Sequence, residues 1–268
     1  MRYFLYGFGL VIFAVSWMIF NISHVFIPSL QAPATTQRII VEENIVTENF
    51  QDSLELTTKA LEPINLEQTV LLDVPFTSQA PMANWHLDAY QYGCEEASLV
   101  MAIYWLKREK LSTEKAEAEI AAMSAFQREQ TGNFYDTSVQ DTVQLMQDYY
   151  GVERINIYSN ATADDIKKEL LEGNLVIVPI NADVIVNPHY TTKVGAHMLV
   201  VTGYDAETKE FITNDPGTKR GEGLRYDAES FGQGIRDYVT GRDTPVVEIQ
   251  KRIIVIEPQE VDIPERTR

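Results

Sequence analysis

The hydrophobic pattern of the chain begins with a long apolar segment. Residues 3–20 carry no charge, and the apolar run continues to Ile27, just before Pro28. At about 1.5 Å per residue, a helix that ends at Ile27 is about 37 Å long, which is enough for a hydrocarbon layer of about 30 Å. The pattern therefore predicts an N-terminal transmembrane anchor over residues 1–27.

A cleaved signal peptide is the alternative interpretation of this segment. The apolar core of a signal peptide normally covers about 7 to 15 residues and ends at a small-residue cleavage site. The nearest such site, Ala32-Pro33-Ala34, lies well beyond the apolar run and contains a proline. Because Arg2 precedes the segment and a long chain follows it, the positive-inside tendency places the N-terminus in the cytoplasm. We therefore expect a single-pass membrane protein whose folded part is extracytoplasmic.

The rest of the chain shows a polar stretch and then a folded body. Residues 28–68 combine prolines and acidic side chains without a sustained apolar period, which indicates an extended stem. The folded domain is predicted over 69–257, and 258–268 form a polar tail. Helices are expected at 94–107, 113–129, 137–149 and 162–172, and strands at 175–180, 197–203, 210–213 and 252–256. Helices followed by an antiparallel sheet indicate an α+β domain.

Two helix starts carry capping signals. Thr162 is followed three residues later by Asp165, a spacing that favours an N-terminal cap for the helix over 162–172. Asp136 or Thr137 is expected to cap the helix over 137–149.

Composition and charge exclude several classes of protein. The 268 residues include 22 Lys and Arg against 39 Asp and Glu, a net charge of −17. This balance argues against a nucleic-acid binder, because affinity for nucleic acid depends on basic side chains. The single cysteine, Cys94, excludes an intramolecular disulfide framework and a metal site built on several cysteines. No metal-binding or nucleotide-binding motif is present in the sequence, so we expect neither a metal nor a cofactor.

Cys94 stands where a nucleophilic thiol can be activated. It follows Gly93 and opens a segment with helical spacing of apolar residues, so the N–H groups and the dipole of a helix start would face the sulfur and lower the pKa of the thiol. Glu95 and Glu96 come next, and a carboxylate beside a thiolate would raise that pKa. We expect both carboxylates to point away from the sulfur. A lone cysteine is also a common core residue, and that interpretation stays open.

A base for this thiol would have to be a histidine. The chain has four: His24, His86, His189 and His197. The first lies at the edge of the predicted anchor and cannot reach Cys94. His197 opens an apolar strand, where a side chain can face a cleft. Asp215 stands at a turn after the next strand, and a hairpin could return its carboxylate to the imidazole and orient the ring. Each of these residues is also compatible with a purely structural role.

Four motifs follow one another along the predicted domain. They are 72–79 (LDVPFTSQ), 92–101 (YGCEEASLVM), 195–205 (GAHMLVVTGYD) and 214–217 (NDPG). In this order they resemble the peptidase C39-like family of papain-like cysteine proteases. The resemblance implies a papain-like fold, with a helical first half packed on an antiparallel sheet. It also implies roles: Cys94 as nucleophile, His197 as general base and acid, Asp215 as the residue that orients the imidazole, and Gln79 as a donor to the oxyanion.

The better-known members of this family are domains of ABC exporters that cut leader peptides after paired glycines. This chain has no nucleotide-binding P-loop and a single predicted spanning segment, so the double-glycine substrate is not carried over. The leading hypothesis is a membrane-anchored, extracytoplasmic cysteine peptidase that cleaves a surface peptide or protein through an acyl-enzyme. Two alternatives stay open: a C39-like module that binds peptides or proteins without cutting them, and a related acyl-transfer enzyme such as a cell-wall amidase or a transglutaminase-like protein.

Overall fold

The computed structural model describes residues 65–241 and 244–261. The predicted anchor, nearly all of the predicted stem and most of the predicted C-terminal tail lie outside these residues and stay predictions. Within the two described ranges, no helix combines the length and the apolar character needed to cross a membrane.

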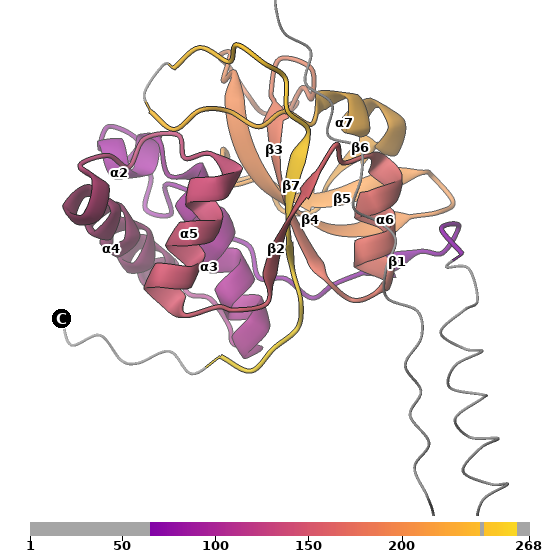
Figure 1. Ribbon diagram of the computed structural model, residues 1–268, viewed down its shortest axis with the longest axis horizontal. Helices are drawn as coiled ribbons and strands as arrows, with labels where there is room; N and C mark the ends of the chain where they lie inside the picture. Colours follow the sequence, from indigo (N-terminus) through magenta and orange to yellow (C-terminus); the bar gives the residue numbers. More distant parts are fainter. Residues whose placement is uncertain (1–64, 242–243, 262–268) are drawn as a thin grey trace, which may run out of the picture. The chain divides into compact units, whose positions relative to one another are not determined.

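The described part of the chain is an antiparallel sheet with helices on both faces (Figure 1). The helices are α2 (Asp88–Gln91), α3 (Cys94–Lys107), α4 (Thr113–Thr131), α5 (Val139–Tyr150), α6 (Ala163–Leu171) and α7 (Ala228–Gly234). The strands are β1 (Val70–Leu71), β2 (Ile155–Ser159), β3 (Leu175–Asn181), β4 (Ala196–Asp205), β5 (Glu210–Asn214), β6 (Leu224–Asp227) and β7 (Arg252–Ile256). Their order in the sheet is β2-β7-β3-β4-β5-β6, and β1 pairs with β4. The predicted α+β fold with an antiparallel sheet is confirmed.

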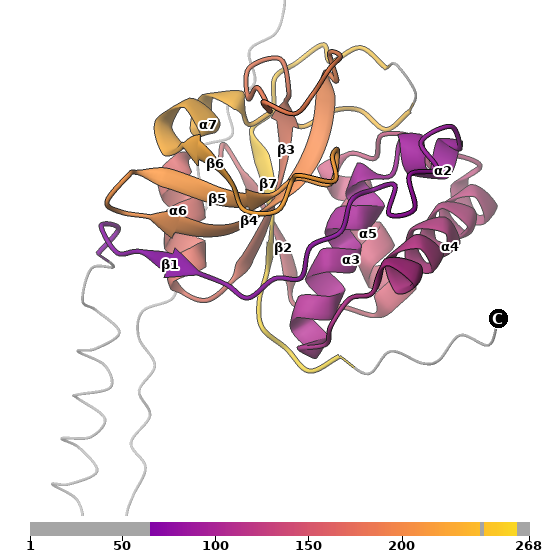
Figure 2. The ribbon, with the colours of Figure 1, turned by 180° about the vertical axis from the view of Figure 1, so that it is seen from behind.

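The central strands are apolar on both faces because both faces of the sheet are covered. On β3, Leu175 and Ile177 belong to the core that includes α3, α4 and α5, whereas Val176 and Val178 belong to the core that includes α6 and α7. Figures 1 and 2 show these three layers from opposite sides. An uninterrupted apolar run is typical of a strand that is buried on both faces. The helix predicted at 162–172 therefore packs on the face opposite to α3–α5.

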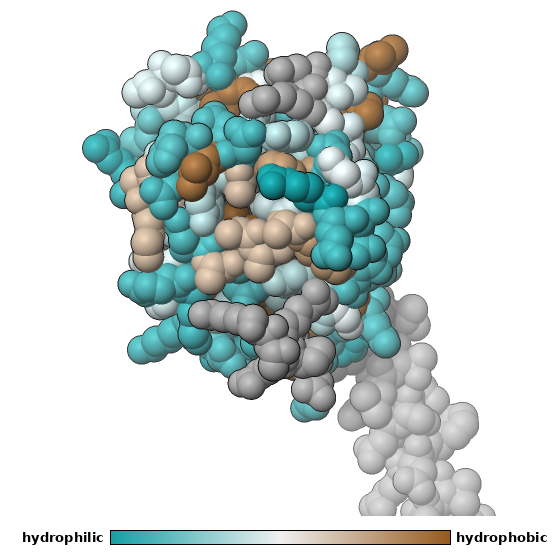
Figure 3. Space-filling model, turned by 90° about the vertical axis from the view of Figure 1, so that its left-hand side faces the viewer, coloured by the Kyte–Doolittle hydropathy of each residue, from teal (hydrophilic) through white to brown (hydrophobic). Residues whose placement is uncertain are grey.

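Helix α3 is the buried centre of the first helical layer. Its residues from Cys94 to Tyr104 are all buried, because α3 packs between the sheet and the outer helices. Helix α4 is amphipathic: it buries Ala116, Ile120 and Met123 and leaves most of its polar side chains to solvent. Figure 3 shows the corresponding face of the molecule, which is largely hydrophilic with small apolar areas. The first residue of α3 is thereby fixed by a helix that cannot move without disturbing the core.

The predicted boundaries agree closely with the structure for the long helices. Helix α3 spans the predicted residues, and the start of α6 has the expected capping box between Thr162 and Asp165. The cap expected at Asp136 or Thr137 is wrong: Ser138 caps α5, and its hydroxyl accepts a hydrogen bond from the Asp141 N–H. Five elements, α2, α7, β1, β2 and β6, were not predicted, because they are short or lie at the edges of the sheet.

Candidate active site

Cys94 is the first residue of α3, as the sequence predicted. Gly93 is the N-terminal cap, and its carbonyl accepts the first helical hydrogen bond, from the Ala97 N–H at 2.9 Å. A Cβ atom at position 93 would lie 2.5 Å from the carbonyl oxygen of Ala89, so only glycine lets α2 and α3 meet at this angle. The short α2 and the glycine therefore determine where the sulfur lies.

His197 and Asp215 meet on neighbouring strands, as the predicted hairpin requires. His197 lies on β4, opposite Ile180 of β3, and Asp215 directly follows the last residue of β5. The imidazole Nε2 lies 2.7 Å from Oδ1 of Asp215, and both side chains are almost fully buried. The structure therefore selects His197, among the three candidate histidines, as the partner of Asp215.

The Asp215 carboxylate is surrounded by hydrogen-bond donors. Its Oδ1 accepts from the Tyr190 hydroxyl at 2.7 Å and the Gly217 N–H at 2.9 Å, and its Oδ2 accepts from Nδ2 of Asn187 at 2.7 Å. Burial by itself would raise the pKa of Asp215, but the charge of His197 and these hydrogen bonds outweigh it, so the pKa is lowered. Asp215 is therefore ionised at neutral pH.

Tyr190 and Gly217 complete this arrangement, and the tyrosine was not among the predicted site residues. The Tyr190 hydroxyl contacts both Asp215 and the His197 Nε2, the latter at 3.0 Å. A Cβ atom at position 217 would lie 2.1 Å from that hydroxyl, so a glycine is needed for the ring to approach. The glycine of the turn motif was visible in the sequence, whereas nothing in the loop around Tyr190 indicated that its ring reaches the histidine.

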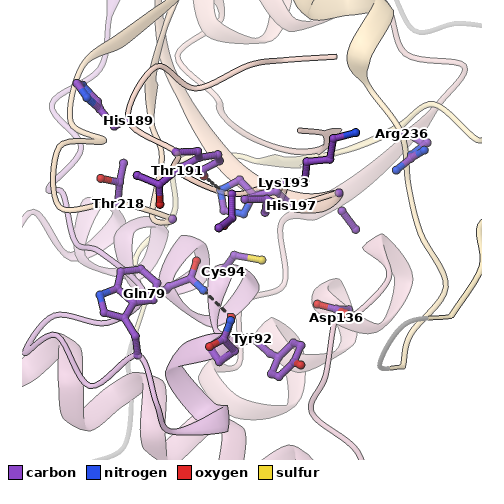
Figure 4. A pocket seen from close by; sticks show the side chains of 18 of the residues that line it. Gln79, Tyr92, Cys94, Asp136, His189, Thr191, Lys193, His197, Thr218 and Arg236 are labelled. Atoms are coloured by element: carbon purple, nitrogen blue, oxygen red, sulfur yellow. Dashed lines mark hydrogen bonds between the residues drawn. The ribbon is translucent and has the colours of Figure 1, made fainter. Parts of the chain in front are cut away.

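The sulfur of Cys94 lies next to the strand that carries His197. The main-chain N–H of Met198, the residue after His197, donates a hydrogen bond toward this sulfur. Figure 4 shows the Cys94 side chain below the imidazole, and both line one cleft of about 950 Å³. Because Nε2 of His197 is occupied by Asp215, the proton of a neutral ring is on that nitrogen and Nδ1 is the free acceptor.

The expected low pKa of Cys94 is wrong for this structure. Burial of the thiol and the charges of Glu95 and Asp136 raise its pKa well above the ordinary value. The expectation that Glu95 points away from the sulfur is also wrong, since the thiol donates a hydrogen bond of 3.2 Å to Oε2 of that carboxylate. Glu96 does turn away, and its Oε1 accepts from Gln127. The thiol is therefore held protonated at neutral pH.

Glu95 is itself a perturbed group. It is buried, and its Oε1 accepts a hydrogen bond from the Tyr238 hydroxyl. Burial is the main cause that raises the pKa of Glu95 to about 7, and the hydrogen bond from Tyr238 opposes it. No sequence pattern indicated Tyr238, which stands 143 residues away along the chain.

Replacement of Glu95 by glutamine is expected to make Cys94 more reactive. The substitution removes the charge next to the sulfur, and a decrease of one unit in the pKa of the thiol raises the thiolate fraction about tenfold. We expect iodoacetamide to alkylate Cys94 about tenfold faster near neutral pH in Glu95→Gln than in the wild type. Glu96→Gln is the matched control, since this carboxylate bonds Gln127 rather than the sulfur. Equal alkylation rates in Glu95→Gln and the wild type would show that the Glu95 carboxylate does not control the pKa of the Cys94 thiol.

The same variant has a second, independent readout. The pKa of Glu95 is about 7 in the folded protein, above its usual 4.5, so between these two values the folded protein holds a proton that the unfolded chain has lost. The free energy of unfolding of the wild type is therefore expected to fall as the pH rises through this window. Burial also raises the pKa of Glu96, which adds to the fall, so Glu95→Gln is expected to lose only the part that Glu95 contributes.

Gln79 lies in the cleft, but both of its N–H groups are engaged. Its Nε2 donates to the main-chain carbonyls of Tyr90 and Gln91, each at 3.0 Å, and its Oε1 is buried without a hydrogen-bond partner among the described residues. The Gln79 main-chain N–H donates to the Pro216 carbonyl at 2.8 Å, which ties this loop to the Asp215 turn. The role of Gln79 as a donor to an oxyanion stays a prediction.

The other candidate residues differ in their distance from the cleft. His189 lines the same cleft, and His86 does not. Asp136 also lines the cleft. The segment 134–138 resembles a loop that domains of the C39-like family place near the cleft, although a helix cap at Asp136 or Thr137 was the preferred prediction. In the described ranges, no group of three or more His, Cys, Asp or Glu side chains is arranged to hold a metal ion.

The model of the peptidase C39-like family matches residues 71–240, a range that includes Gln79, Cys94, His197 and Asp215. No curated protein matches the chain. Among solved structures, a candidate C39-like peptidase from Bacillus anthracis is 16% identical, with a TM-score of 0.47, and the match covers 73% of this chain and 100% of that one. Because the family model covers more than half of the sequence, this chain belongs to the peptidase C39-like family.

Proposed function

We propose that this protein is a cysteine peptidase that cleaves a peptide bond through an acyl-enzyme formed on Cys94. The observation that carries the proposal is the buried His197–Asp215 pair beside the start of α3, with the Cys94 sulfur in the same cleft. A thiol, an imidazole and a carboxylate in this arrangement supply the nucleophile, the base and the orienting group of an acyl-transfer site. Membership of a peptidase-like family supports the same reaction.

In the first step, the Cys94 sulfur attacks the carbonyl carbon of the substrate. Because the thiol is held protonated, its proton passes to Nδ1 of His197 as the carbon–sulfur bond forms, rather than before. Asp215 is ionised and stabilises the imidazolium that results. The Cys94 N–H stands in the first turn of α3, where N–H groups have no partner within the helix, and it can donate to the oxyanion.

In the second step, the imidazolium returns the proton to the departing amine, and a thioester remains on Cys94. A water molecule then attacks the thioester carbon and gives a proton to His197. The carbon–sulfur bond breaks, the acyl group leaves as a carboxylic acid, and the imidazolium returns the proton to the Cys94 sulfur. Gln79 is proposed as a second oxyanion donor. For that role one of its N–H groups has to exchange the Tyr90 or Gln91 carbonyl for the substrate oxygen.

Mass spectrometry of a proteome-derived peptide mixture tests this proposal. Incubation with the full chain is expected to create new peptide ends, each corresponding to the addition of one water per broken bond, and Cys94→Ser is expected to create none. A binding module would retain peptides on both proteins without products. An acyl-transfer enzyme would instead attach an added amine, such as glycine amide, to the acyl group. Either of these results would replace peptide hydrolysis as the function.

We also propose that the N-terminal segment anchors the domain on the outer side of the cytoplasmic membrane. The uncharged run over 3–20 and the position of Arg2 support this location. A protease added to intact cells is expected to cut within the stem, between about residues 30 and 68, and to release a soluble fragment. A fragment that is protected until the cells are opened would mean that the orientation is reversed.

A further inference from the structure

The cleft differs in charge from the rest of the chain. Acidic residues outnumber basic ones by 39 to 22 in the whole sequence, yet the side chains that line the cleft include four basic residues and one acidic residue. The basic ones are Lys193, Lys219, Arg220 and Arg236, and the acidic one is Asp136. A concave surface with an excess of one sign of charge concentrates its field and attracts ligands of the opposite sign.

The four basic side chains have no acidic partner among the residues that the structure describes. None of them forms an ion pair with another residue in the ranges that the structure describes. Arg236 is the most constrained of them. Its main-chain N–H donates to the Pro179 carbonyl at 3.0 Å, next to the bridge between Ile235 and Ile180. Its Nε is buried without a hydrogen-bond partner among the described residues. A buried donor without a partner costs stability, and a carboxylate of a bound ligand can satisfy it.

The basic side chains flank the reacting groups. Lys193 stands in the loop that leads into β4, four residues before His197, and Figure 4 shows Lys193 and Arg236 on the imidazole side of the cleft. Thr218, which precedes Lys219 and Arg220, lies on the other side of Cys94 in the same view. These cations would oppose the positive charge that forms on His197 during the reaction. A carboxylate brought by the substrate would offset that repulsion.

We propose that the cleft selects acidic peptides, with an Asp or Glu side chain of the substrate placed against Arg236 and Lys193 close to the bond that is cut. This inference rests on the proposed peptidase function, because it treats the bound peptide as a substrate. The selection of acidic peptides is itself a property of binding and does not require cleavage. A C-terminal carboxylate of a peptide would present the same chemistry. Peptides with an amidated C-terminus distinguish the two sources, because they keep only the side-chain carboxylates.

The test measures binding to the full chain with Cys94→Ser, which prevents turnover. The probes are two fluorescein-labelled, C-terminally amidated peptides of equal length, one of alternating Ala, Gly and Glu and one with Gln in place of Glu. At low salt the Glu peptide is expected to bind about fivefold more tightly. The additional changes Lys193→Gln and Arg236→Gln are expected to bring the ratio of the two dissociation constants close to one. Lys110→Gln is the matched control, because it removes the same charge from an exposed site outside the cleft.

Equal or undetectable binding of both peptides would overturn the inference, and so would a ratio that survives both substitutions in the cleft. If Arg236→Gln lowers the thermal stability, the ratio of dissociation constants measured with Lys193→Gln alone decides whether the inference holds. Lys193 is exposed in a loop, so its replacement is not expected to affect folding. The peptide mixture used for the cleavage assay separates this inference from the proposed function. Cys94-dependent cuts without enrichment of Asp or Glu near the cut bond would refute the selection of acidic peptides and support the peptidase function. A preference for the Glu peptide without any cuts would refute the peptidase function and support the selection of acidic peptides.

Discussion

Cys94→Ser is expected to lower kcat/KM for peptide hydrolysis by about 10⁴-fold or more, because removal of one member of a catalytic triad leaves only the contribution of binding and of the oxyanion donors. Serine keeps the shape of the side chain at the start of α3, so the thermal unfolding temperature is expected to stay close to that of the wild type. The rate of appearance of new peptide ends, measured by mass spectrometry, checks the first expectation, and circular dichroism checks the second.

The two histidines of the cleft provide a matched comparison for this result. His197→Ala is expected to cause a loss of similar size, since the base and the nucleophile act as a unit. His189→Ala is expected to change kcat/KM by only a few-fold, because Asp215 bonds His197 and not His189. Activity that survives Cys94→Ser, or a larger loss with His189→Ala than with His197→Ala, would mean that the reacting groups have been assigned wrongly.

The long elements could be predicted because their sequence patterns reflect burial directly. The helical spacing after Gly93 and the apolar run in β3 result from packing on two sides, and both appear in the structure where the sequence placed them. The short elements α2 and β6 could not be predicted in this way. Each is four residues long, too short to show a period, and both depend on contacts with distant segments.

The polar side of the site was predictable only in part. Pairing of β4 with β5 places Asp215 near His197, and a hairpin follows from turn signals in the sequence. Tyr190, Asn187 and Tyr238 reach the site from loops, and no local pattern fixes the direction of a loop side chain. The raised pKa of Cys94 was missed for the same reason. The helix start was predicted correctly, but whether Glu95 turns toward the sulfur depends on burial and on Tyr238, which comes from far along the chain.

Asp215→Asn is expected to lower kcat/KM by about 10³- to 10⁴-fold. Four donors surround this carboxylate, from His197, Tyr190, Gly217 and Asn187, and a neutral amide cannot accept from all of them. With its oxygen toward His197, the amide sets its NH₂ against the NH₂ of Asn187 and supplies no charge to stabilise the imidazolium. In the opposite orientation its NH₂ faces Nε2 and forces the ring into the other tautomer, which occupies the nitrogen that has to accept the thiol proton.

The matched control for this change is Asp205→Asn, which removes the same charge from a carboxylate paired with Arg225 outside the cleft. It is expected to leave kcat/KM within about twofold of the wild-type value, because surface ion pairs contribute little to the stability of the fold.

The dependence of stability on acid pH is a second readout, and a purely catalytic role of Asp215 would not change it. The pKa of Asp215 is lowered by folding, so the stability that its ionised form contributes is present above the pKa of the unfolded chain and is lost as the pH falls through the folded value. Asp215→Asn is expected to remove that part of the acid dependence. An Asp215→Asn protein that keeps full activity would exclude the carboxylate from the mechanism and leave His197 to act with Cys94 alone.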